Sequence, residues 1–107
     1  MHEAGAVGRA LDAALRAGPP GADAPRAATL VVTDPAHIAA PAAELHLQVH
    51  LAEHGLGAIP ITTTVRAVAC QACGVESVPQ PSDPYCSACG WPLPATGGPG
   101  VEIGLEW

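Results

Sequence analysis

The chain has 107 residues, a formal net charge of −6, and four arginines but no lysine. A chain of this length can bury one small core, or a small core beside a metal-stapled module. Phosphate contacts need clustered cations, so this acidic composition argues against nucleic-acid binding. Charged residues at Glu3, Arg9, Asp12 and Arg16 interrupt any apolar run long enough for a signal peptide or a membrane span. We therefore expect a cytoplasmic protein with no membrane partner.

The first predicted element is a helix over residues 4–17. One apolar stripe recurs along it at helical spacing, made of Val7, Leu11, Ala14, Leu15 and Gly18. The Gly-Pro-Pro-Gly run at residues 18–21 ends this helix, because neither residue type continues a helix well. A short, mostly apolar strand over residues 27–33 follows a loop.

The segment 44–51 fits two patterns. Its polar and apolar residues alternate, as in a half-buried strand. A helical stripe is also present, widened by Leu47 and Leu51 and formed by Ile38, Ala42, Leu45, Val49 and Ala52. Pro41 suits the first turn of a helix and Gly55 suits its end. We predict a helix whose polar face lies opposite Leu45 and Val49.

The last third of the chain is predicted to form two strands that flank a cysteine-rich insert. Residues 59–69 are rich in β-branched side chains and predict a strand that runs into Cys70. Residues 92–100 form a return linker, and alternation over residues 101–106 predicts a final strand with one buried face. We expect the strands before and after the insert to pair. The fold class is then α+β (mixed α/β), with two helices, a three-stranded sheet and an inserted four-cysteine zinc ribbon.

The four cysteines of the chain form two Cys-x2-Cys pairs, each followed by glycine: Cys70 and Cys73, then Cys86 and Cys89. Two such turns can surround one tetrahedral metal with four thiolates, and the glycine suits the positive φ that often follows the second ligand. Zinc is the favoured ion and iron in a rubredoxin-like site the alternative. Two disulfides are the non-metal alternative, which belongs mainly to secreted proteins. A site with every position filled by Cys is structural rather than catalytic.

The terminus Met1-His2-Glu3 offers a second metal site. The terminal amine, nearby backbone nitrogens and the His2 imidazole can together provide planar nitrogen donors, the geometry preferred by Ni(II) and Cu(II). A frayed terminus without function is the plainer interpretation of these residues.

Three histidines recur at i, i+4 and i+8, namely His46, His50 and His54. On a helix they line one side, where an i, i+4 pair can chelate a metal. A solvated polar face is the favoured interpretation, and we expect the three imidazoles to be dispensable for primary nickel binding.

The sequence has no Gly-x4-Gly-Lys-Ser/Thr phosphate loop and no catalytic set outside the cysteines, so we expect a protein that is not an enzyme.

Taken together, Met1-His2-Glu3, the order of predicted elements and the four-cysteine ribbon make the chain resemble the hydrogenase nickel-incorporation (HypA/HybF) family of nickel metallochaperones. The resemblance covers the whole chain in layout, and in residue identity it is concentrated at the terminus and the cysteines. It implies nickel at Met1, His2 and Glu3, with Glu3 contributing through its backbone, and structural zinc at the cysteines.

The resemblance also implies two domains, partners and a role. Residues 1–69 plus 99–107 would form a nickel-binding α/β domain, and residues 70–98 the zinc ribbon with its return linker. The implied partners are a maturation GTPase and the large subunit of a [NiFe] hydrogenase, with urease as another client, and the chain itself would be a monomer or weak homodimer. The competing interpretations are a zinc-ribbon interaction module without a nickel role and a rubredoxin-like electron carrier.

Overall fold

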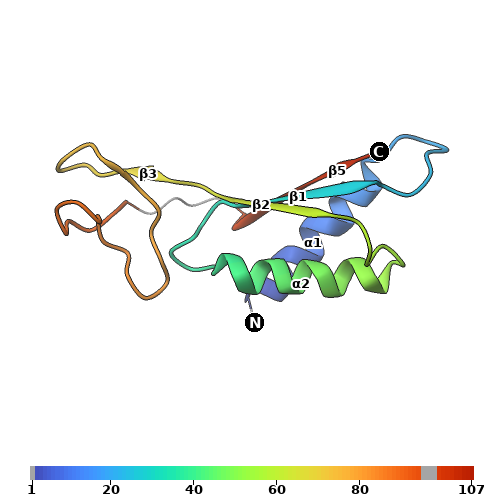
Figure 1. Cartoon of the computed structure of the whole chain (residues 1–107), viewed down its shortest axis with the longest axis horizontal. Helices are drawn as coiled ribbons and strands as arrows, with labels where there is room; N and C mark the ends of the chain where they lie inside the picture. Colours follow the sequence, from blue (N-terminus) through green and yellow to red (C-terminus); the bar gives the residue numbers. More distant parts are fainter. Residues whose placement is uncertain (1, 95–98) are drawn as a thin grey trace.

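The structure, a computed structural model, describes residues 2–94 and 99–107, with side chains from residue 5 onward. Two helices cover one face of a mixed sheet, and a cysteine-rich ribbon extends beyond one end of it (Figure 1). This confirms the predicted α+β class. The elements within the described ranges are α1 (His2–Arg16), β1 (Ala27–Val32), α2 (Ala40–Glu53), β2 (Ile61–Val65), β3 (Val68–Ala69), β4 (Glu76–Ser77) and β5 (Val101–Glu106).

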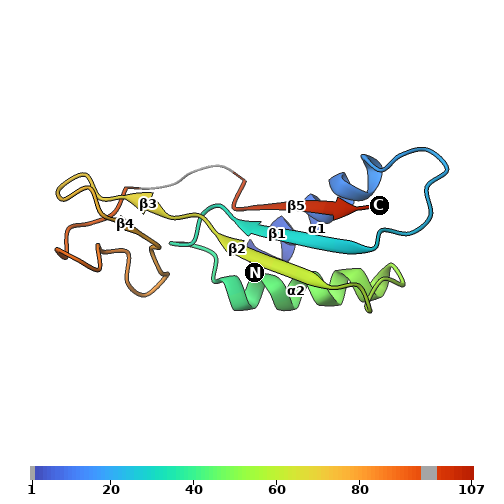
Figure 2. The same ribbon diagram turned by 45° about the horizontal axis from the view of Figure 1, so that its top comes forward.

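Strand β1 lies at the centre of the sheet, in the order β2-β1-β5 (Figure 2). It runs parallel to β2 and antiparallel to β5. The expectation that the strands before and after the ribbon pair with each other is therefore wrong. Two parallel strands joined by a helix lie side by side in one sheet, so β1-α2-β2 places β2 on one edge of β1 and leaves the other edge to β5. The central strand also carries the most completely buried apolar face, at Ala28, Leu30 and Val32.

The ribbon leaves and rejoins the sheet at the same end. Val32, the last residue of β1, is opposite Val65 at the end of β2 and opposite Val101 at the start of β5. Beyond this row the predicted strand over residues 59–69 breaks, because β1 has turned away and offers no further partner. Its continuation, β3, pairs instead with β4 inside the ribbon. The result is an elongated molecule of 50 × 24 × 20 Å.

Helix α1 packs on the sheet through Val7 and Leu11, two members of the predicted stripe, which are completely buried. Gly18, just after the helix, lies so close to the Trp107 ring that no Cβ would fit there. In the part of the chain that the structure describes, neither helix is both long and apolar enough to cross a bilayer.

Helix α2 exists as predicted, but it buries only the part of the predicted apolar face that Leu47 and Leu51 form. Ala43, Leu47 and Leu51 are buried, while Leu45 and Val49 are 59% and 51% exposed. Leucines occur on both sides of this helix, so apolar periodicity does not decide which side is buried. The rotation is set by tertiary contacts: Thr63 of β2 donates a hydrogen bond of 3.0 Å to Glu44 on one side.

The face of α2 that the structure buries predicts unequal effects on stability for two leucines of this helix. Leu47→Ala should lower the free energy of unfolding by about 2–5 kcal/mol, because it removes a fully buried side chain and leaves a cavity. Leu45→Ala, the matched control, should change it by less than about 0.5 kcal/mol, because that side chain already contacts solvent. Urea unfolding of the two variants measures the difference, and equal effects would contradict the assigned rotation of α2.

Candidate metal centre

Each Cys-x2-Cys-Gly segment folds into the same tight turn. Gly74 N–H donates to the Cys70 carbonyl at 2.8 Å, and Gly90 N–H donates to the Cys86 carbonyl at 2.9 Å. Both glycines have positive φ, 78° and 77°, a conformation that a side chain disfavours. The glycine after each pair therefore has the role that the sequence predicts for it.

Short hairpins hold the two turns. Cys70 N–H donates to the Val75 carbonyl at 3.0 Å, and Cys86 N–H donates to the Trp91 carbonyl at 2.8 Å. The first turn lies at the tip of the β3–β4 hairpin, and a bridge between Tyr85 and Pro92 closes the second. The two hairpins are alike, so they present their cysteines to each other from equivalent positions.

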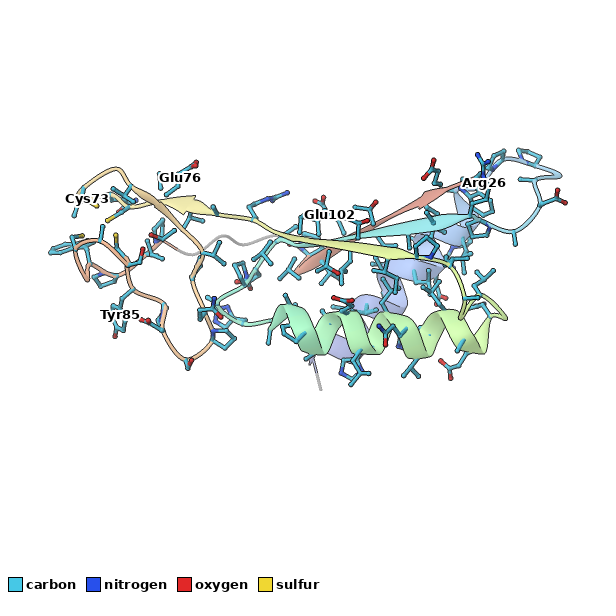
Figure 3. The ribbon with its side chains drawn as sticks, in the orientation of Figure 1. Arg26, Cys73, Glu76, Tyr85 and Glu102 are labelled. Atoms are coloured by element: carbon cyan, nitrogen blue, oxygen red, sulfur yellow. The ribbon has the colours of Figure 1, made fainter. Side chains whose placement is uncertain are left out.

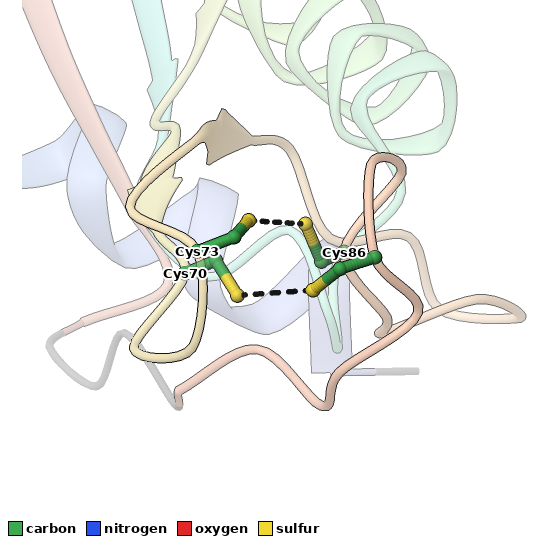
Figure 4. Close-up of side chains that lie close together, drawn as sticks. Cys70, Cys73 and Cys86 are labelled. Atoms are coloured by element: carbon green, nitrogen blue, oxygen red, sulfur yellow. Dashed lines mark hydrogen bonds between the residues drawn. The ribbon is translucent and has the colours of Figure 1, made fainter.

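The four sulfurs meet between the hairpins (Figure 4). Cys70 Sγ is 3.7 Å from Cys89 Sγ, Cys73 Sγ is 3.6 Å from Cys86 Sγ, and all four atoms lie within 4.8 Å of one another. Four thiolates about 2.3 Å from one tetrahedral zinc would lie roughly 3.8 Å apart. A disulfide needs about 2.05 Å, and none of the four cysteines is disulfide-bonded. The spacing fits one shared metal ion.

One half of the site is buried and the other faces solvent. Cys70 and Cys86 are buried, whereas Cys73 and Cys89 are exposed. Cys86 Sγ accepts hydrogen bonds from the Ala88 N–H at 3.4 Å and from the Ser77 hydroxyl at 3.9 Å. Ser77 is 8% exposed. Sequence analysis missed this serine, since a lone serine before a proline-rich loop carries no signal for a role beside a metal.

The hydrogen bonds divide the thiols into two kinds. The N–H groups of Cys89 and Ala88 lower the pKa of Cys86 to about 6. The N–H of Cys73 is the main cause that lowers the pKa of Cys70. For Cys89, the Trp91 N–H acts to lower the pKa, but desolvation and the neighbouring thiols together outweigh it and raise the pKa to about 12. The pKa of Cys73 is also raised: the Val75 N–H favours its thiolate, but desolvation and Cys86 outweigh it. Each close pair of sulfurs thus joins a thiol of lowered pKa to one of raised pKa.

This pairing predicts how metal affinity depends on pH. A metal binds thiolates, so binding must displace at least the protons held by Cys73 and Cys89, whose pKa values are raised. Zinc affinity should therefore fall as pH decreases, and fall more steeply below about pH 6, where Cys86 also takes up a proton. Competition with a chromophoric chelator between about pH 5.5 and 8 measures this, and a zinc affinity independent of pH would contradict it.

Four thiolates without an open position suit a structural ion. Soft sulfur donors in a tetrahedron favour zinc, and iron has the same preference for this geometry. The surroundings do not suit polyanions, since residues 67–107 contain no lysine, arginine or histidine. Figure 3 shows Glu76 and Cys73 on the ribbon at one end of the molecule, and Arg26 at the opposite end. The cysteines can thus hold a metal such as zinc, and they leave no coordination position for a substrate.

Of the nickel residues predicted from sequence, His2 and Glu3 lie at the beginning of α1. Met1 is outside the described residues, and for His2 and Glu3 the structure describes only backbone, as the first residues of the helix. Of the other histidines, His37 pairs with Asp34 in the loop after β1 at 3.1 Å. His50 lies over Gly8 of α1, and its side chain is 30% exposed. His54 lies near Asp12 and is 44% exposed, as the predicted solvated face requires.

Searches of protein-family models and of curated proteins found no match to this chain. The chemistry of this chain is therefore argued from its own residues. Four cysteines lie close enough to bind one metal ion, on a ribbon carried by an α+β domain.

Proposed function

We propose that this protein is a nickel metallochaperone that keeps structural zinc at Cys70, Cys73, Cys86 and Cys89. It would bind Ni(II) through Met1, His2 and Glu3 and deliver it during maturation of a [NiFe] hydrogenase, with urease as the alternative client. The observation that supports this proposal is the order of elements. A helix that begins at His2, a strand, a second helix, a strand, a four-cysteine ribbon and a final strand follow one another, as the resemblance to the HypA/HybF family implies.

The chemistry of the terminus supports nickel rather than zinc. A terminal amine, backbone nitrogens and an imidazole make a planar nitrogen set, which Ni(II) prefers and tetrahedral zinc does not. The positive end of the α1 dipole disfavours a cation, and deprotonated backbone nitrogens in the coordination plane would offset this. Because the four thiolates fill a tetrahedron, the ribbon would not carry the transported ion.

The proposal needs partners. With no phosphate loop and no lysine, this chain would not use a nucleotide to drive nickel release. A partner GTPase would supply that energy, and the hydrogenase large subunit would receive the ion. The chain itself would act as a carrier and not as an enzyme, as a monomer or weak homodimer in the cytoplasm.

A second candidate function is a zinc-ribbon interaction module without a nickel role. The observation that favours it is the exposure of apolar side chains on the ribbon: Val75, Val78, Tyr85 and Trp91 are between 39% and 56% exposed. A rubredoxin-like electron carrier is separated from both by the bound metal, because iron–thiolate sites are coloured and zinc sites are not.

Nickel titration of the His2→Ala variant tests the proposal. Loss of tight Ni(II) binding with zinc retained would support a chaperone, and unchanged nickel binding would leave the interaction module as the better assignment.

A further inference from the structure

The contact between α1 and α2 is lined by histidines. Because α2 buries Ala43, Leu47 and Leu51, His50 in its last turn lies beside α1. His54, the residue that caps the C-terminal end of α2, also lies near α1. His50 lies over Gly8, where an added Cβ would be 3.5 Å from both Cε1 and Nε2 of the ring. One turn further along both helices, His54 lies beside Asp12. The two helices thus run in the same direction here (Figure 1), and we call Asp12, His50, Glu53 and His54 the helix seam.

A carboxylate already orients one imidazole of the helix seam. His50 Nδ1 is 3.0 Å from Glu53 Oε1, so the neutral ring donates its Nδ1 proton to the carboxylate. Nε2 then has a free lone pair, on the side of the ring that faces α1. Histidines that bind metals commonly have this arrangement, in which a carboxylate fixes the tautomer and makes the other nitrogen more basic.

A second and a third donor lie one helical turn away. His54, the C-cap residue of α2, follows His50 at i+4, the spacing at which two histidines of a helix can bind the same ion. Its Nε2 is 3.8 Å from Asp12 Oδ1, which is too long for a hydrogen bond. Two ligands about 2.1 Å from one tetrahedral ion would lie roughly 3.4 Å apart, so a small rotation brings these atoms into range. Both side chains are about half exposed, at 44% and 56%, and can rotate without unpacking the core.

We propose that the helix seam is a second metal site, which binds a divalent transition ion through His50 Nε2, His54 Nε2 and the Asp12 carboxylate. Two imidazoles and one carboxylate suit Ni(II), Cu(II) or Zn(II) and not the oxygen-preferring Mg(II) or Ca(II). Among the described residues, only the four cysteines have three or more ligand atoms gathered in advance. The seam is therefore a two-histidine anchor that Asp12 closes on binding, and it binds more weakly than the ribbon. An ion there ties α1 to α2.

The test uses zinc-loaded His2→Ala protein, so that the proposed terminal site makes no contribution. Titration with Ni(II) should show one further equivalent, with paramagnetic broadening of the His50 and His54 ring signals in histidine-labelled protein. The double variant His50→Gln/His54→Gln should lose this equivalent, and His37→Gln, the matched control on a loop, should keep it. Glu53→Gln should weaken it by about 10–100-fold, because that residue only orients His50. Far-UV circular dichroism confirms that each variant is folded.

Two results would overturn the proposal. One is the absence of any bound nickel equivalent in the zinc-loaded His2→Ala protein. The other is an equivalent that survives His50→Gln/His54→Gln with unchanged affinity. Neither depends on the chaperone function, which is decided by how much more tightly the chain with His2 binds nickel than the His2→Ala variant does.

Discussion

Replacing Cys86 by serine should remove the metal from the ribbon and unfold residues 70–91, while the α/β domain keeps its helices. A serine hydroxyl is a poor ligand for a site built for soft thiolates, and the ribbon has little else to hold it together. The strands β3 and β4, which pair at its base, are each two residues long, and among residues 70–91 only Cys70, Ser77, Pro79 and Cys86 are buried. Metal analysis should fall from about one zinc per chain to well below half, and amide exchange in the ribbon should lose its protection.

Ser82→Ala is the matched control, because Ser82 is an exposed ribbon serine that contributes no thiolate. It should retain the full zinc content and the exchange protection. Mass spectrometry of the native protein offers an independent check. Two disulfides and no metal would refute the metal centre. A red protein that contains iron instead of zinc would favour a rubredoxin-like electron carrier.

His2→Ala should weaken the tightest Ni(II) binding by at least about 100-fold and leave the zinc content unchanged. The imidazole is one of the few nitrogen donors available at the terminus. Loss of a metal ligand should reduce the metal affinity at least as much as loss of a residue that only orients a ligand. An N-terminal tag left in place should have a similar effect, because it converts the amine of Met1 into an amide. Isothermal titration of the untagged chain, the tagged chain and the variant measures both effects.

The acid dependence of nickel binding provides a second readout of the same site. Nickel needs a neutral imidazole, so affinity should fall as pH drops below about 6.5, the ordinary range of histidine. Substitution of His37 by glutamine is the control, and it should alter neither the affinity nor its pH dependence. Equal nickel affinity in the untagged chain, the tagged chain and the His2→Ala variant would reject the chaperone.

The two cysteine turns of the ribbon could be predicted from sequence, because their geometry is local. Four residues set the path of each turn, and the glycine at its end sets the sign of φ, as Gly74 and Gly90 confirm. Helix α1 could also be predicted from sequence, since Val7 and Leu11 recur at the helical period and a Gly-Pro run ends the helix. In both cases, the information lies within one or two turns of the backbone.

Tertiary structure alone decided which strands are neighbours and which side of α2 is buried. Alternation identifies a strand but not its partner, and β1 became central because the β1-α2-β2 crossover filled one of its edges and β5 filled the other. Helix α2 has leucines on opposite sides, so the packing against the sheet and α1 chose Leu47 over Leu45. That choice also turned His50 and His54 toward α1. The sequence by itself determined the local elements and the cysteine turns, and long-range packing determined how they face one another, because burial is settled between elements and not within them.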